Sequence, residues 1–146
     1  MDTRIDIKLS PVMFNRAPTV RIGIGNDLHD IILTKPTWFH WSIDQLQDTS
    51  IILTVEQYGK TNKDTIPEQQ LDTAIVIEEV KLNGLTSPKF AWAGVYRPEY
   101  PAHYPNKIPE LTNLNYLGWN GVWTLKLTVP IYTWIHKIEN LGWIYD

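Results

Sequence analysis

Apolar and polar residues alternate along several stretches of the chain, as in a strand with one buried face. In the stretch 122–129, Trp123, Leu125 and Leu127 share one side, whereas threonines and Lys126 share the other. The same alternation predicts further strands over residues 3–9, 19–24, 28–33, 37–43 and 49–57. We expect Ser10-Pro11 to end the first of these strands.

One strand-like segment, residues 72–83, carries two registers in succession. Ile75 and Ile77 fall on one face, and Val80 and Leu82 fall on the other. A β-bulge inserts one extra residue into a strand and so restores a single buried face. The change falls at Glu78-Glu79, where we predict such a bulge.

The period changes near the end of the chain. Apolar residues then recur at the spacing of a helix with one buried face, namely Ile131, Trp134, Ile135 and Ile138. Pro130 suits the first turn of this helix, and Gly142 is placed to end it. The segment Gly118–Gly121, which contains Asn120-Gly121, is typical of a hairpin turn.

Turns separate the predicted strands, and helices do not alternate with them, which argues against a parallel α/β sheet. Two packed antiparallel sheets bury many one-faced strands. We therefore predict an all-β single domain over residues 1–146, an antiparallel jelly-roll-like β-sandwich of seven to nine strands with one short C-terminal helix. An immunoglobulin-like sandwich is the alternative.

The composition restricts the partners that the chain can have. Hydrophobic residues make up 43% and charged residues 20%, as in globular proteins. The net charge of -3 gives no electrostatic reason to expect nucleic acid. No apolar run approaches the ~20 residues of a membrane span, so we expect no membrane insertion. Residues 1–6 lack the apolar core of a signal peptide, and the absence of cysteine excludes disulfides and thiolate zinc sites.

Tryptophan and tyrosine are unusually frequent, with seven of each against three phenylalanines. Several of these rings lie in loop-like sequence, in part because four prolines interrupt residues 98–109. Such rings combine an apolar body with a polar tip, which suits a binding surface or a subunit interface. The predicted ligand-binding residues are Trp92, Tyr96, Tyr100, Tyr104 and Trp119, with Tyr116 nearby. Alternatively, these rings cover a sheet edge or the short helix.

An acidic loop over residues 59–70 is the candidate metal site. Asp64 lies within it, Asp72 lies just after it, and Glu78 follows in the next strand. Hard oxygen ligands between two strands suit Ca²⁺, although the spacing is not that of an EF-hand. In the alternative interpretation, the two aspartates cap turns through their own side chains.

Signatures of catalysis are absent from the sequence. There is no nucleophile elbow, and Gly23-Ile24-Gly25 lacks the third glycine of a dinucleotide-binding loop. A glycoside hydrolase would need two facing acids, with Glu78 or Glu79 as candidates. We therefore expect a protein that is not an enzyme and needs no cofactor, calcium excepted.

Two parts of the chain resemble known families. The runs 51–65 and 72–84, a strand, an acidic loop and a strand ending in Asn83-Gly84, resemble the middle of calcium-dependent, xylan-binding-type carbohydrate-binding modules. The closing run, Tyr116 to His136, resembles small proteins of tailed bacteriophages, including those that infect cyanobacteria. The first resemblance implies a jelly roll, a sugar ligand and Ca²⁺ near Asp64. The chain departs from it in showing no secretion signal and no attached catalytic domain.

Two hypotheses follow from these observations. In the first, the chain is a non-enzymatic phage protein, located in the virion, that binds other virion proteins or assembles with itself. In the second, it is a carbohydrate-binding module whose Trp and Tyr rings stack on a glycan. Without the phage resemblance, the missing signal peptide would predict a cytoplasmic location.

Overall fold

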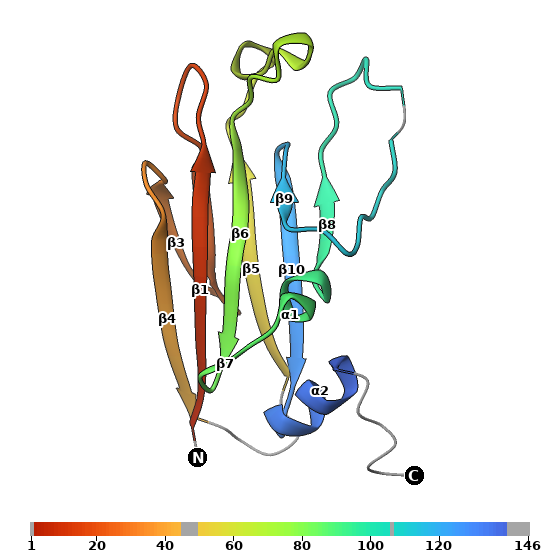
Figure 1. Cartoon of the computed structure of the whole chain (residues 1–146). Helices are drawn as coiled ribbons and strands as arrows, with labels where there is room; N and C mark the ends of the chain where they lie inside the picture. Colours follow the sequence, from red (N-terminus) through yellow and green to blue (C-terminus); the bar gives the residue numbers. More distant parts are fainter. Residues whose placement is uncertain (1, 45–49, 106, 140–146) are drawn as a thin grey trace.

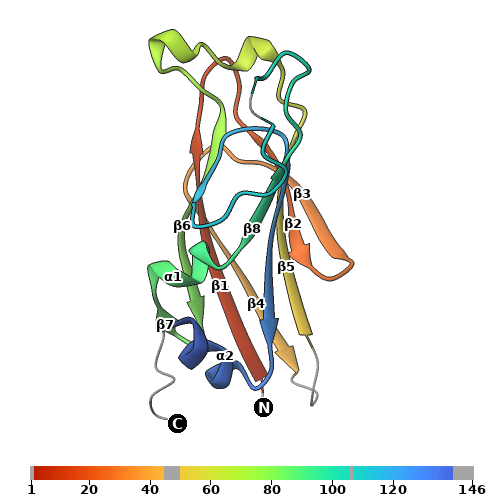
Figure 2. The same cartoon turned by 90° about the vertical axis from the view of Figure 1, so that its right-hand side faces the viewer.

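The computed structural model describes residues 2–44, 50–105 and 107–139, which form two antiparallel sheets packed face to face (Figures 1 and 2). The first sheet has the order β4-β1-β6-β7, with β9 also paired to β6, and the second has the order β3-β2-β5-β10-β8. The first sheet contains β1 (Asp2–Val12), β4 (Thr37–Asp44), β6 (Ala74–Leu82), β7 (Leu85–Thr86) and β9 (Tyr116–Leu117). The second contains β2 (Thr19–Ile24), β3 (Asp27–Ile32), β5 (Ser50–Tyr58), β8 (Val95–Pro98) and β10 (Gly121–Thr128).

This arrangement confirms the predicted jelly-roll-like antiparallel sandwich. Eight of the strands in the described residues have four residues or more, and the other two, β7 and β9, have two residues each. The alternating residues of β1 and β10 point inward as predicted: Ile5, Ile7, Trp123, Leu125 and Leu127 are all fully buried. Full burial of one such side chain stabilises the fold by about 1.5–3 kcal/mol.

The predicted bulge in β6 is confirmed. Lys8 of β1 lies opposite Glu79, whereas the next residue, Leu9, lies opposite Ile77. Glu78 is therefore the extra residue, and its insertion keeps Ile77 and Val80 in the core, each about 1% exposed. The strand ends where Asn83-Gly84 turns the chain into β7.

The predicted end of the first strand at Ser10-Pro11 is wrong, since β1 continues to Val12. Proline is tolerated there because the pairing of β1 with β4 ends at Leu9, opposite Thr37. Beyond that point the strand is paired with β6 alone, so one of its edges is open and can carry a residue without an N–H group.

The turn at Gly118–Gly121 does not close a hairpin, contrary to the prediction. It carries the chain from β9 in the first sheet to β10 in the second. Gly121 is required here, because it has a φ of 147° and a side-chain carbon would lie 2.4 Å from the carbonyl oxygen of Arg97.

Two α-helices pack beside the sheets, α1 (Pro88–Trp92) near β6 and α2 (Ile131–Ile138) near β10. The predicted helix α2 buries Ile131, Trp134 and Ile135, and the predicted stop at Gly142 lies outside the described residues. Helix α1 was not predicted. Its Phe90 ring packs 5.9 Å from the ring of Trp134, which joins the two helices. No helix among the described residues has the length and apolar character needed to cross a membrane.

Several long loops gather at the end of the sandwich away from α2 (Figures 1 and 2). The connection from β5 to β6 forms two short 3₁₀ helices there, η1 (Asn62–Asp64) and η2 (Pro67–Gln69). The proline-rich segment after β8 rises beside them (Figure 2). Residues of both segments line a groove.

Candidate ligand-binding site

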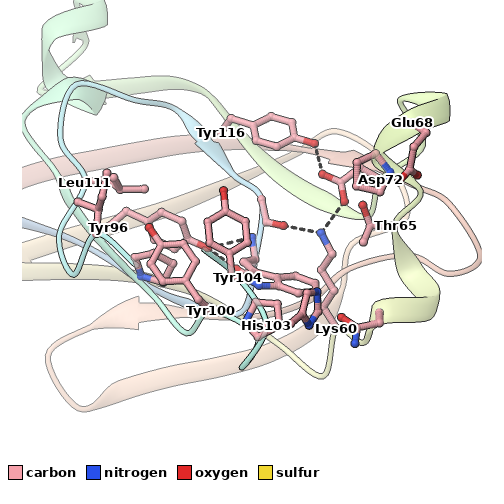
Figure 3. A pocket seen from close by; sticks show the side chains of 17 residues that line it. Lys60, Thr65, Glu68, Asp72, Tyr96, Tyr100, His103, Tyr104, Leu111 and Tyr116 are labelled. Carbon is pink, nitrogen blue, oxygen red and sulfur yellow. Dashed lines mark hydrogen bonds and ion pairs between the residues drawn. The ribbon is translucent and has the colours of Figure 1, made fainter. Parts of the chain in front are cut away.

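The groove has a volume of about 790 Å³ and opens to solvent at this end of the molecule (Figure 3). One wall comes from the β5–β6 connection, with Lys60, Thr65, Glu68 and Asp72. The opposite wall comes from the segment after β8, with Tyr100, His103 and Tyr104 (Figure 3). Tyr96, Tyr116 and Trp119 also line the groove. Small-ligand sites in proteins have volumes of roughly 300–1,000 Å³ and few, well-placed polar groups, which is the character of this groove.

Lys60 supplies a buried positive charge to the groove. Its side chain is 2% exposed, and its Nζ donates hydrogen bonds to Asp72 Oδ1 at 2.5 Å and to the carbonyl oxygen of Gly118. The same ammonium lies 4.5 Å from the centre of the Trp119 ring. Burial lowers the pKa of Lys60 below its ordinary value, and the hydrogen bond and charge of Asp72 oppose this shift.

Asp72 connects Lys60 to a tyrosine. Its Oδ1 accepts hydrogen bonds from Lys60 and from the backbone N–H of Thr73 at 2.9 Å, and its Oδ2 accepts one from the Tyr116 hydroxyl at 2.5 Å. Figure 3 shows Lys60, Asp72 and Tyr116 linked in this order. Burial and then the bond to Asp72 raise the pKa of Tyr116, so its hydroxyl stays a donor at neutral pH.

Tyr100 and Tyr104 form the aromatic wall. Their rings stack with centroids 4.8 Å apart and planes 14° from parallel. Tyr104 is 44% exposed and Tyr100 is half-buried. The two rings therefore offer apolar area with phenolic tips, a surface that can bind a partly apolar, hydroxyl-rich ligand.

The structure corrects the predicted role of Tyr96. It is not a loop ring but part of the edge strand β8, and it is only 2% exposed. Its hydroxyl donates to the carbonyl oxygen of Trp119 and accepts a hydrogen bond from the Trp119 backbone N–H at 3.1 Å. Burial strongly raises its pKa. Tyr96 thus holds the Trp119 turn in place beneath the groove.

Of the five residues predicted to bind a ligand, the groove brings together Tyr96, Tyr100, Tyr104 and Trp119. The fifth, Trp92, is 43% exposed but lies on α1 and does not line the groove. Sequence reasoning missed Lys60, because a single lysine in a polar loop is usually solvated. It also missed His103 and Glu68, whose neighbouring sequence carries no signal of a site.

Asp64 caps a turn through its own side chain, which was the alternative to metal binding. It is 2% exposed and accepts hydrogen bonds from the Thr61 backbone N–H at 2.8 Å and from Asn15 Nδ2 at 2.9 Å. Arg16 Nε lies 3.4 Å from its Oδ2. Burial opposes ionisation of Asp64, but these bonds and the charge of Arg16 together lower its pKa. Asp64 therefore caps η1 and ties it to the segment after β1.

The predicted calcium ligands are not arranged as an ion site. Asp64 is paired with Arg16, Asp72 is paired with Lys60, and Glu78 is exposed at the bulge of β6. Within residues 2–44, 50–105 and 107–139, no three His, Asp or Glu side chains lie close enough to hold a metal ion. A calcium ion takes six to eight oxygen ligands, and here the carboxylates of Asp64 and Asp72 are already bound to cationic side chains.

The hydrolase alternative depended on Glu78 or Glu79 facing a second acid across a cleft. Neither residue lines the groove, and Glu79 lies opposite Lys8 in the ladder between β1 and β6. The acids that do line the groove are Asp72, which is ion-paired, and Glu68 on η2. The structure therefore does not place the predicted catalytic acids in a site.

Comparison with solved structures identifies a known architecture. The fold is similar to that of carbohydrate-binding modules. The selenomethionine form of vCBM60, described in terms of two families of calcium-dependent carbohydrate-binding modules, matches with a TM-score of 0.51 and 14% identity over 84% of this chain and 89% of that chain. The complex of vCBM60 with galactobiose matches with a TM-score of 0.51 and 13% identity over 84% of this chain and 96% of that chain. No protein-family model and no curated protein sequence matches the chain.

The likeness confirms, at the level of fold, the resemblance predicted from residues 51–65 and 72–84. The resemblance of the closing run to phage proteins stays a prediction. A virion location stays a prediction as well.

Proposed function

We propose that this chain is a non-enzymatic carbohydrate-binding module whose groove binds a neutral oligosaccharide. The observation that carries the proposal is the stacked pair Tyr100–Tyr104 facing polar side chains across a groove of about 790 Å³. A sugar ring has apolar C–H faces and polar hydroxyl edges, so it needs an aromatic surface and hydrogen-bonding groups together. The likeness to vCBM60, one structure of which contains galactobiose, supports the same class of ligand.

A neutral ligand fits the charges of the groove. The positive charge of Lys60 is balanced by Asp72, and the remaining acid, Glu68, is exposed. No strong field of either sign therefore favours a highly charged ligand. The hydroxyls of Tyr100, Tyr104 and Thr65, together with Asn62, provide uncharged donors and acceptors around the opening.

The shape of the site favours a glycan over the virion-protein partner that was the first hypothesis. A stable protein interface buries roughly 800 Å² on each partner, whereas small-molecule sites are concave. Here the rings line a concave site instead. Assembly with virion proteins or with a second copy of the chain remains a prediction that would involve surfaces outside the groove. Glycan binding would also be compatible with a module carried on a virion.

The proposal is tested by titrating galactobiose and a panel of neutral β-linked oligosaccharides into the protein. Trp119 lines the groove, so tryptophan fluorescence should change on binding, and isothermal titration calorimetry should give the affinity. We expect at least one oligosaccharide to bind with saturation and with one site per chain. If no glycan of the panel produces a response by either method, while the protein forms a concentration-dependent oligomer, the virion-assembly hypothesis is favoured instead.

A further inference from the structure

Lys60 is unusual in being a loop lysine with a side chain that is 2% exposed. Removing an ammonium from water costs several kcal/mol unless the group is paired and its three donors are satisfied. The structure supplies the partners, namely the Asp72 carboxylate, the Gly118 carbonyl and the face of the Trp119 ring. The buried charge is therefore fully coordinated by groups of the groove.

The backbone of Lys60 is fixed as firmly as its side chain. Its N–H donates to Asn120 Oδ1 at 2.8 Å, and its carbonyl oxygen accepts from Asn120 Nδ2 at 2.8 Å. The Asn120 side chain thus binds both the N–H and the carbonyl group of Lys60 and holds them against the turn that carries Trp119. Because side-chain and backbone bonds converge on the same turn, Lys60 is held in this position and is not a surface residue that happens to fold inward.

These partners are atoms that a hard cation would use. Carboxylate and backbone carbonyl oxygens are the usual ligands of calcium, and in this groove an amine already binds Asp72 and Gly118. An ion at this place would have to displace the Lys60 ammonium from both of these oxygens. Asp64 does not offer a second carboxylate, because Arg16 and Asn15 engage it.

We propose that the Lys60 ammonium is the structural cation of the groove, positioning Asp72, Tyr116 and Trp119, and that ligand binding is consequently independent of calcium. The inference rests on the proposed function, and it separates this chain from its structural neighbour, which is described as calcium-dependent. Lys60 acts here as a positioning residue. It orders the base of the groove without needing to touch the ligand.

The experiment measures glycan binding and calcium binding separately. Oligosaccharide affinity is determined by calorimetry in excess EDTA and in millimolar calcium chloride, and calcium alone is titrated into the EDTA-treated and desalted protein. We expect the two affinities to agree within about twofold and calcium to give no saturable heat. A tenfold difference between the buffers would instead mean that calcium and glycan binding are coupled by about 1.4 kcal/mol. The melting temperature should also be the same in both buffers.

Two variants test the part played by the charge. Lys60→Met keeps the length of the side chain but removes the cation, and it should weaken glycan binding at least about tenfold, since it leaves the partly buried Asp72 without its ion-pair partner. If this variant folds poorly, the double variant Lys60→Met, Asp72→Asn removes both charges. It should fold, and its glycan affinity should stay below that of the wild type. Lys63→Met is the matched control, because Lys63 is an exposed lysine of the same loop that does not line the groove.

Each result decides the inference. Equal affinity in both buffers, with weakened binding in the Lys60 variants alone, supports it. Glycan binding that requires calcium overturns it and leaves the carbohydrate-binding function intact. If no glycan binds in either buffer, the proposed function fails, and the calcium titration still decides whether this groove holds an ion. Unchanged affinity in the well-folded double variant also overturns the inference.

Discussion

The rings of Tyr100 and Tyr104 stack 4.8 Å apart on a loop that begins at the edge strand β8. The loop is shaped by its own sequence, since Pro101 fixes one backbone angle and its carbonyl oxygen accepts a hydrogen bond from the Tyr104 N–H at 3.0 Å. A turn of this kind places the two side chains next to each other. Because the pair is formed before a ligand arrives, less conformational entropy is lost on binding.

The first prediction concerns this pair. Replacing Tyr100 or Tyr104 with alanine should weaken oligosaccharide binding by at least about 1 kcal/mol, roughly fivefold, because each change removes aromatic area from the groove wall. Calorimetry on the folded variants measures the loss. Trp92→Ala is the control, since Trp92 is an exposed ring outside the groove and should leave the affinity unchanged. Equal losses in all three variants would place the binding surface elsewhere.

The second prediction concerns the ionisation of Tyr116. Burial and the bond to Asp72 raise its pKa above the ordinary tyrosine value of about 10. A titration of tyrosinate absorbance should therefore show tyrosines that ionise only at a higher pH than ordinary tyrosines, and Tyr116→Phe should reduce their number by one. Asp72→Asn should return the Tyr116 pKa toward its ordinary value, because the carboxylate no longer opposes formation of the phenolate. An unchanged late phase in both variants would contradict the bond.

The same shift has a consequence for stability. Above about pH 10 the folded state keeps the Tyr116 proton that the unfolded chain loses. The contribution of this group to the free energy of unfolding is therefore present below that pH and declines as the pH rises. Tyr96, whose pKa is raised by burial, acts in the same direction.

Much of the fold could be predicted from the sequence because burial in a sandwich follows a period of two. Ile5, Ile7 and Leu9 alternate with polar residues, and all three are fully buried. Even the change of register in β6 was visible, because an apolar face that switches sides requires one extra residue, which is Glu78. These are local signals. Because side chains alternate between the two faces of a strand, the pairing register decides which of them enter the core.

The site was less predictable because its members meet only through the path of the whole chain. Lys60 is buried because Asp72 and Asn120, twelve and sixty residues away, converge on it. Tyr96 and Trp92 looked equivalent in sequence, yet one lies in a strand beneath the groove and the other on a helix outside it. That helix did carry a local signal that was missed, since Ser87 caps it and Pro88 begins it.

A third prediction follows from Asp64. Asp64→Asn should lower the free energy of unfolding by about 1–3 kcal/mol at neutral pH, because the variant loses the charge that faces Arg16 and weakens the bonds from Thr61 and Asn15. The pKa of Asp64 is lowered, so the stability that it contributes is present above the unfolded value near 3.8 and is lost as the pH falls through the lower folded value. Urea unfolding at neutral and acidic pH measures this.

The acid dependence distinguishes a charge effect from a packing effect. The difference between wild type and Asp64→Asn should shrink as the pH falls below about 4, where the unfolded carboxylate becomes protonated. Glu78→Gln serves as the control, because Glu78 is exposed at the bulge and should change stability by less than about 0.5 kcal/mol. A difference that stays constant over the whole pH range would show that Asp64 acts through shape alone.

The last prediction concerns the contact between Gly94 and Trp123. A side-chain carbon added at Gly94 would lie 2.1 Å from Trp123 Nε1, and the Trp123 ring is completely buried. Gly94→Ala should therefore force the ring to move and destabilise the fold by about 1–3 kcal/mol. The near-ultraviolet circular dichroism of the tryptophans should change with it. Gly84→Ala is the comparison, since Gly84 has a φ of +82° but no atom within 4 Å, so that variant should lose stability through backbone strain and keep the native tryptophan signal. The same change of signal in both variants would mean that Trp123 is not packed against Gly94.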